Sequence, residues 1–181
     1  APVVLKGAHA SNSYTHMNGD VGAAIYTGET SNFSGLCRIG SKDSPDDDVT
    51  LFMGTGVTLG TVTQDGGTVT YNSNTTALDL NRGEARFLQV TLGTLTILGG
   101  TCTYNSTGTL TTAVVGGDGH LDFSEDPRAK TVTNAIDLHG LESRLSDPYK
   151  VVASLVVDVN YQGLGERHRL CDNSTVIDED R

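Results

Sequence analysis

Glycine recurs at a fixed step through the centre of this chain. The glycines of the series lie 17 residues apart and then 23 residues apart, at Gly66, Gly83, Gly100, Gly117, Gly140 and Gly163. Two of the repeats are nearly identical in sequence, namely GTVTYNS from Gly67 and GTCTYNS from Gly100, and GHLDFS from Gly119 is a variant of them. A fixed period of this length predicts a chain built from stacked structural repeats.

Between the glycines, apolar residues alternate with polar ones, which is typical of a half-buried β-strand. A unit of 17 residues is too short for a strand and a helix. It accommodates two or three short strands separated by bends, with glycine at a corner that needs a positive φ or a close approach. Stacking would place equivalent apolar residues about 4.8 Å above one another. The expected columns are Leu78, Leu95 and Thr112, and Leu80, Ile97 and Val114.

We therefore predict an all-β fold, a parallel β-solenoid (β-helix) of about six short coils with irregular caps. The alternative is an antiparallel sandwich, whose closely spaced turns also produce short alternating strands. The equal steps and the column matches favour the solenoid. The predicted organisation is an N-terminal cap or arm over 1–48, the β-helix over 49–163 and a C-terminal cap or arm over 164–181.

Several finer features follow from the same pattern. Short strands are expected at 21–26 and 36–39 within the N-terminal cap, and the most apolar coil, 83–99, is expected in the middle of the rod. The coils after Gly117 are longer by six residues. We expect the extra residues in two loops that contain Asp-Pro, a turn-forming pair, at 124–130 and 146–149.

Composition and charge argue against several functions. The net charge is −10 and the basic residues form no cluster, which disfavours nucleic-acid binding. No apolar window is long enough to span a membrane, and the N-terminus lacks the pattern of an uncleaved signal peptide, although a removed one stays open. Cys37, Cys102 and Cys171 are widely spaced and odd in number, which predicts free thiols and synthesis in a reducing cytoplasm. Cys102 falls at the column position of Val69, where a small buried residue is expected.

Catalysis on β-helices commonly uses carboxylates to cleave carbohydrate, so the acidic residues are candidate site residues. The candidates are Asp46, Asp47, Asp48, Asp65, Asp79, Glu84, Asp118, Asp122, Glu125 and Asp126. Shifting by one period places Asp65 near Arg82 and Asp79 near Thr96, so no acidic column emerges. Asp118 and Asp122 are expected to approach Glu125, and Asp46 to Asp48 are interpreted as an exposed acidic loop.

Metal and nucleophile motifs do not stand out. The histidines lie far apart, at His9, His16, His120, His139 and His168, and neither they nor the cysteines have the spacing of zinc ligands. We therefore predict no catalytic residue, no cofactor and no metal site.

Threonine is abundant, and Thr-x-Thr pairs suggest hydroxyl ladders like those of ice-binding solenoids. One period after Thr68 and Thr70, however, come Ala85 and Phe87, so the expected ladder is interrupted and this function is disfavoured. The coils from 49 to 117 carry only two basic residues. Because charge is the usual protection of a sheet surface, flat and nearly uncharged faces predict contact with a partner.

The GGTVTY segment, the GTCTYNSTGTLTT segment and the HLDFS segment followed by TVTN resemble the β-helical structural proteins of tailed bacteriophages. These include capsid decoration (cement) proteins and fibre proteins, and the resemblance covers roughly 49–140. It implies a homotrimer on the capsid surface of the virion, bound to the major capsid protein. It carries over no catalytic residue.

The resulting hypothesis is a non-enzymatic virion protein whose interface lies in the N-terminal cap and in the loops 124–130 and 145–149. Two alternatives stay open. One is a carbohydrate-binding or carbohydrate-cleaving spike domain, and the other is a bacterial surface adhesin.

Overall fold

The computed structural model describes residues 4–5, 14–16, 23–25, 31–33, 37–40, 50–55, 57–139, 142–152, 155–160 and 174–177. Side chains are described within 37–40, 50–55, 57–139 and 142–152, and at Val156. The expected acidic loop at 46–48 and the histidines His9 and His168 lie outside the described residues, as do Cys171, Gly140 and Gly163.

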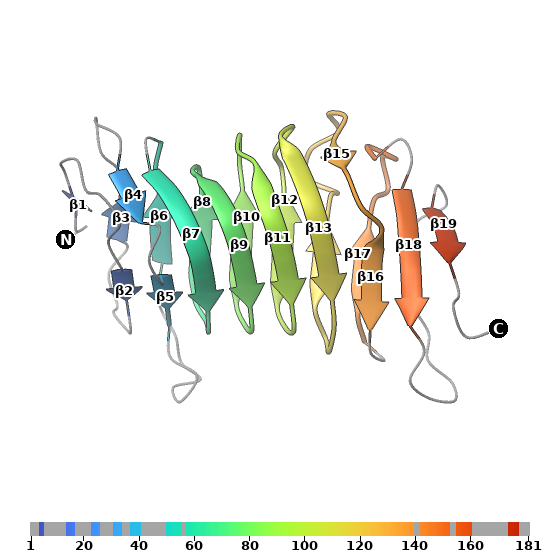
Figure 1. Cartoon of the computed structure of the whole chain (residues 1–181), viewed down its shortest axis with the longest axis horizontal. Helices are drawn as coiled ribbons and strands as arrows, with labels where there is room; N and C mark the ends of the chain where they lie inside the picture. Colours follow the sequence, from blue (N-terminus) through green and yellow to red (C-terminus); the bar gives the residue numbers. More distant parts are fainter. Residues whose placement is uncertain are drawn as a thin grey trace.

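Every described element is a strand, and the strands form two long sheets (Figure 1). The 8-stranded sheet contains, in spatial order, β1 (Val4–Leu5), β3 (Ala23–Ile25), β6 (Thr50–Met53), β8 (Thr68–Tyr71), β10 (Glu84–Phe87), β12 (Thr101–Tyr104), β14 (His120–Asp122) and β17 (Arg144–Ser146). The 11-stranded sheet contains β2 (Tyr14–His16), β5 (Cys37–Ile39), β7 (Val57–Gln64), β9 (Asn74–Leu80), β11 (Leu92–Ile97), β13 (Thr109–Val115), β16 (Ile136–His139), β18 (Leu155–Asn160) and β19 (Ser174–Ile177), with β4 (Ser31–Phe33) on β7 and β15 (Thr131–Val132) on β13.

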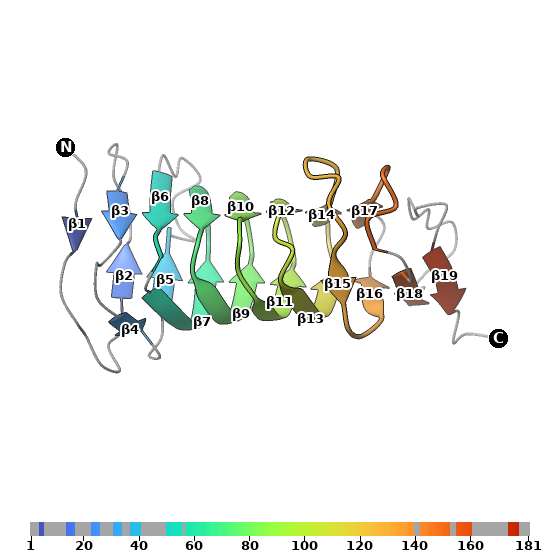
Figure 2. The same cartoon turned by 90° about the horizontal axis from the view of Figure 1, so that it is seen from above.

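Each strand pairs in parallel with the equivalent strand of the next coil, as in β8 with β10 and β9 with β11. The chain is therefore a parallel β-solenoid, as the sequence predicts, and the antiparallel sandwich is wrong. The ladders extend beyond 49–163, because β1 to β5 and β19 join the same two sheets. The expected short strands of the first 48 residues correspond to β3 and β5. Figure 2 shows the coils stacked side by side along the rod.

Each central coil has three outward faces because its long strand bends. In β9, Thr76 and Ala77 both point away from the core, which interrupts the alternation of buried and exposed residues at that point. β13 has a bend at the equivalent position, because its first part pairs with β15 and its second part pairs with β16. We call the outer surface of β8, β10, β12 and β14 the first face. The first and second parts of the long strands β7, β9, β11 and β13 carry the second and third faces.

The register matches the predicted columns in two coils and departs from them in the third. Leu78 pairs with Leu95, and Leu80 pairs with Ile97, as predicted. The next members are Ala113 and Val115, so the predicted Thr112 and Val114 are wrong. Counted between paired residues, the step from Tyr104 to Leu110 is one residue longer than the step from Phe87 to Leu92. The step from Val115 to the corner Gly117 is one residue shorter than the step from Ile97 to Gly100. The two changes cancel in the glycine period but displace the strand between them by one residue.

Glycine occupies one corner of each central coil. Gly67, Gly83, Gly100 and Gly117 have positive φ, so the corner residue of the first of these coils is Gly67 and the predicted Gly66 is wrong. A Cβ added at Gly100 would lie 2.2 Å from the carbonyl oxygen of Gly83. Both the φ angle and the close approach of the backbones therefore require glycine.

The core is a stack of side chains along the rod axis. Tyr71, Phe87, Tyr104 and Phe123 are fully buried and lie above one another, with 4.7 Å between the ring centroids of Tyr71 and Phe87. The coil 83–99 lies in the middle of the rod, as expected (Figure 1).

The two described cysteines belong to this core. Cys102 continues the column of Val69 and Ala85, which confirms its predicted position. Cys37 and Cys102 are free and buried, and burial raises the pKa of the Cys37 thiol to about 12 and also raises that of Cys102. Because the thiolate is the reactive form, both groups are chemically inert.

Candidate functional site

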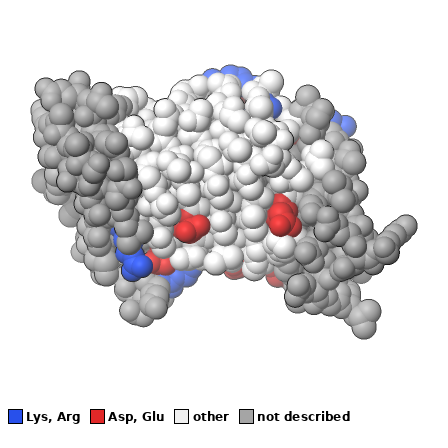
Figure 3. Space-filling model, in the orientation of Figure 1, with Lys and Arg blue, Asp and Glu red and all other residues white. Residues whose placement is uncertain are grey.

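The three faces differ in charge. On the described second face the outward residues are threonine, asparagine and glycine, with no ionisable side chain: Thr58, Gly60, Asn74, Thr76, Thr91, Gly93, Thr109, Thr111, Thr131 and Thr133. The third face carries Arg38, Asp79 and Asp137 among threonine, alanine and valine. Figure 3, seen from the side of the long strands, is accordingly white over most of its described area. The first face carries most of the charges, including Glu84, Arg86, Asp122 and Arg144.

A continuous polar ladder runs along the second face. Thr58 pairs with Asn74, and Thr109 pairs with Thr131. The Oδ1 atom of Asn74 accepts hydrogen bonds from the backbone N and from Oγ1 of Thr91, at 3.0 and 3.1 Å. The pairing of Leu92 with Leu110 places Thr91 beside Thr109, so the ladder covers five successive coils.

The sequence did not predict this ladder, because its members are not the Thr-x-Thr pairs that stand out in the repeat. The ladder sought at Thr68 and Thr70 is interrupted, as expected, but these residues pair with Glu84 and Arg86, so the predicted partners Ala85 and Phe87 are wrong. The spacing along the second face varies from coil to coil, and only the strand register identifies its members.

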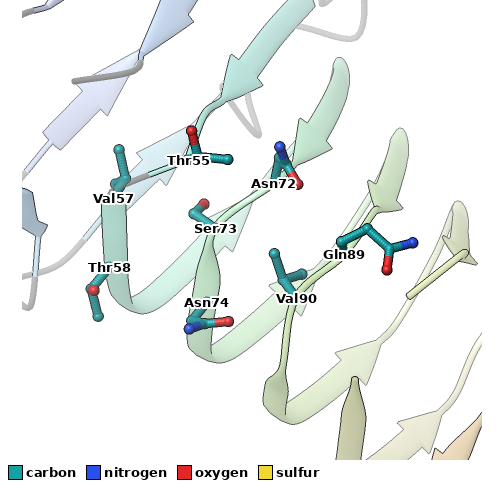
Figure 4. A pocket seen from close by; sticks show the side chains of 8 residues that line it. All are labelled: Thr55, Val57, Thr58, Asn72, Ser73, Asn74, Gln89 and Val90. Atoms are coloured by element: carbon teal, nitrogen blue, oxygen red, sulfur yellow. The ribbon is translucent and has the colours of Figure 1, made fainter. Parts of the chain in front are cut away.

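A hollow of about 420 Å³ adjoins the beginning of this ladder (Figure 4). Its lining contains hydroxyls, amides and two valines and has no ionisable group: Thr55, Val57, Thr58, Asn72, Ser73, Asn74, Gln89 and Val90. Thr58 and Asn74 belong to both the hollow and the ladder, so the two features form one surface.

Ser73 gives this hollow a feature that packing does not explain. The residue is 2% exposed, and its hydroxyl has no hydrogen-bond partner. The equivalent Ser106, in the second copy of the Tyr-Asn-Ser tripeptide, accepts hydrogen bonds from the backbone N of Val90 at 2.8 Å and of Gly108 at 2.9 Å, and donates to the carbonyl oxygen of Val90. The same tripeptide therefore closes the corner of one coil and leaves a free hydroxyl in another.

A second hollow, of about 320 Å³, lies on the first face and contains carboxylates. Asp122 and Glu125, which the sequence was expected to bring together, both line it, with Glu84 and Arg86. The carboxylates have structural partners: Glu125 forms an ion pair with Arg86 and accepts from Nδ2 of Asn105 at 3.0 Å, and Asp122 accepts from the backbone N of Ser124 at 2.7 Å.

The other acidic candidates are dispersed. Asp118 is outside the lining of this hollow and lies at the corner near Gly99. Asp65 accepts from Nδ2 of Asn81 at 2.8 Å, and its carbonyl oxygen accepts from Nε of Arg82 at 3.1 Å, which confirms the expected proximity of Asp65 and Arg82. Asp79 lies beside Thr96, as expected.

The loop 124–130 is tied back onto the preceding coils. Asp126 accepts from Nε of Arg128 at 2.9 Å and from the buried Nζ of Lys130 at 2.9 Å. The hydrogen bonds from Arg128 hold the pKa of the Asp126 carboxyl well below its usual range; burial opposes this shift, and the hydrogen bond from Lys130 adds to it. Arg128 also donates to the carbonyl oxygen of Asn105 at 3.2 Å, so the loop follows the corner of the solenoid.

The second predicted loop is held by a buried carboxylate. Asp147 accepts from the backbone N of Val151 at 2.8 Å and of Val152 at 3.2 Å. Tyr149 lies at the tip of this loop and is 60% exposed.

One histidine of the first face has a close polar partner. Nε2 of His120 lies 2.8 Å from Oγ of Ser146 on the next strand. Burial lowers the pKa of His120, Asp122 opposes this effect, and Arg144 adds to it. The neutral ring is therefore favoured. Within the described residues, no group of three or more His, Cys, Asp or Glu side chains is arranged to hold a metal ion.

Comparison with known proteins found no matching family model, no matching curated protein and no matching solved structure. Across the described part of the chain, no helix has the length and apolar character needed to cross a membrane.

Proposed function

We propose that this chain is a non-enzymatic structural protein of a tailed-phage virion, a trimeric decoration protein that binds the outer surface of the capsid. The observation that carries the proposal is a rigid solenoid with wide, nearly uncharged threonine faces. The resemblance of its repeats to β-helical phage proteins supports the same role.

The third face is the proposed contact between subunits. Its outward residues include Thr63 on β7 and Thr94 and Thr96 on β11, and Ala77 and Asp79 of β9 lie between these strands. The carboxylates of this face, Asp79 and Asp137, are separated by uncharged residues. Apposing this face removes fewer carboxylates from water than apposing the first face, with Glu84, Asp122 and Glu125, which matters for a chain with a net charge of −10. The charged first face then stays in solvent, where net charge favours solubility.

The oligomer is tested by light scattering on a sizing column. We expect a mass three times the 19.0 kDa of one chain. Thr94→Arg, which places a charge between the uncharged Ala77 and Thr112 of the third face, should reduce the mass to that of a single chain. Thr70→Arg on the first face is the matched control and should leave the trimer intact. A wild-type monomer would contradict the proposed trimer.

The virion role is tested on particles of the phage that encodes the chain. We expect the protein in purified virions and, after it has been removed, rebinding of the purified trimer to the capsid in a sedimentation assay. Particles that never contain the chain would contradict the role, whatever its oligomeric state.

Carbohydrate cleavage is a second candidate function, and the hollow with Glu84, Asp122 and Glu125 favours it. Two carboxylates at a sugar-binding surface are the usual apparatus of glycoside hydrolysis. Release of reducing ends from a bacterial polysaccharide, and loss of that release in Asp122→Asn, would replace the structural role with this one.

A further inference from the structure

The ladder and the hollow of the second face together have the form of a binding surface. The ladder places one Thr or Asn side chain on each of five coils, from Thr58 to Thr131, with a rise of about 4.8 Å per coil. Thr58, Thr91 and Asn74 are exposed, so their polar groups are accessible.

The hollow supplies a second and independent observation. It begins beside Thr58 and Asn74 and has a volume of about 420 Å³. The buried hydroxyl of Ser73 lies in its lining without a partner, although a buried polar group is normally hydrogen-bonded. A ligand hydroxyl in the hollow would supply the missing partner.

The chemistry of this surface defines the ligand class. The lining offers hydroxyl and amide groups, which both donate and accept, and the methyl groups of Val57 and Val90. It has no charged group with which to pair an ionised ligand. An uncharged polyhydroxylated molecule matches these groups, and a regular ladder matches a ligand that repeats along its length.

We propose that the second face binds an extended, uncharged polysaccharide chain along the rod axis, with one sugar ring in the hollow at Ser73. Successive sugars lie over successive coils, and their hydroxyls exchange hydrogen bonds with the Thr and Asn side chains of the ladder. This site is separate from the proposed subunit contact on the third face, and it does not depend on the virion role.

The probe is cellohexaose, an extended and uncharged hexasaccharide, titrated by calorimetry and by NMR into the full chain. Because the surface has no aromatic ring to stack on a sugar, we expect weak binding, with a Kd on the order of 1 mM. Hexagalacturonate should not bind, since it is anionic and the protein has a net charge of −10. Maltohexaose, which coils, should bind less well than cellohexaose.

Two conservative variants test the residues. Ser73→Ala and Thr58→Val each remove one hydroxyl and should weaken cellohexaose binding about fivefold, the effect of one lost hydrogen bond. Thr50→Val, the matched change on β6 and outside both hollows, should leave the affinity unchanged. Because the hydroxyl of Ser73 has no hydrogen-bond partner and Thr58 is exposed, the folded structure should tolerate both changes.

Several results would overturn the proposal. One is the absence of cellohexaose binding at about 10 mM, well above the expected Kd. Another is binding that Ser73→Ala and Thr58→Val leave unchanged, because the sugar would then lie elsewhere. If Thr91→Arg instead dissociates an oligomer of the chain, the second face is a contact between subunits and not a sugar site.

Discussion

At the scale of single residues, the serines of the two Tyr-Asn-Ser tripeptides differ in their hydrogen bonds: the Ser106 hydroxyl is bonded to the backbone and the Ser73 hydroxyl is not. The Ser106 hydroxyl accepts hydrogen bonds from the backbone N of Val90 and of Gly108 at a tight corner. Ser73 follows the same Tyr-Asn pair, but its hydroxyl has no hydrogen-bond partner. The two serines therefore contribute differently to stability.

Replacing each serine by alanine tests this difference. Ser106→Ala should lower the free energy of unfolding by about 2 kcal/mol, because it removes the hydrogen bonds that the hydroxyl accepts from the N–H groups of Val90 and Gly108. Ser73→Ala should change it by less than about 0.5 kcal/mol, because no hydrogen bond is lost. Urea denaturation measures both values, and equal losses for the two variants would contradict the assignment.

The ion pair of Asp126 with buried Lys130 is the other residue-scale determinant. The pKa of Asp126 is depressed in the folded protein. Its contribution to stability is therefore present above the unfolded pKa of about 3.9 and is lost as pH falls toward the folded pKa. Fully buried Lys130 would be left without its charged partner if this carboxylate were removed.

Asp126→Asn should cost about 3 kcal/mol at neutral pH, as expected when one member of a buried ion pair is removed. The variant should also lose less stability than the wild type on acidification below pH of about 4. Thermal unfolding across a pH series checks both effects. Parallel stability curves for the two proteins would show that Asp126 is not the group responsible.

At the scale of the structural element, the corner glycines determine how closely successive coils approach. Gly100 has a φ of 82°, and its missing Cβ makes room for the carbonyl oxygen of Gly83. Gly116 lies near the next corner but has no positive φ, and an added Cβ there would make ordinary contacts at 3.7 Å or more. Gly116 is therefore a matched control position for a substitution at Gly100.

Gly100→Ala should destabilise the protein by at least about 2 kcal/mol, since the left-handed conformation and the backbone clash both oppose a side chain. Gly116→Ala should change the stability by less than about 1 kcal/mol. Calorimetric melting temperatures provide the comparison. If Gly100→Ala melted at the wild-type temperature, the corner would have to accept a side chain by shifting the neighbouring coil.

At the scale of the whole molecule, a single column of aromatic rings connects the central coils. The ring of Phe87 lies between those of Tyr71 and Tyr104, with centroid distances of 4.7 and 5.9 Å. In a solenoid each coil contacts only its neighbours, so stability depends on the interfaces between adjacent coils.

Phe87→Ala should therefore weaken two interfaces at once and lower the free energy of unfolding by about 4 kcal/mol. Phe87→Leu, which fills more of the space, should cost less than half as much. Hydrogen exchange should show faster opening of the amides of β8, β10 and β12 than of β16. Uniform acceleration along the rod would indicate that the chain opens only as a single unit.

The fold was largely predictable because its signals are local. Alternation of apolar residues defines strands such as 92–97, and a recurrent glycine marks a corner of the backbone. Both signals can be identified without knowing which other strands lie nearby. The position of Cys102 in the core and the closeness of Asp65 to Arg82 follow from the period alone. These features require only that the coils stack.

Other features depend on contacts that a period cannot specify. The shift from Thr112 to Ala113 arises from two turns whose changes in length cancel, and only the demand for a filled core decides which residue points inward. The same register creates the ladder of the second face. The ion pair of Asp126 with Lys130 and the unpaired hydroxyl of Ser73 depend on how one coil meets the next. The sequence by itself thus determined a solenoid with glycine corners, because alternation and φ are local properties, whereas tertiary packing decided its surfaces, because these arise between coils.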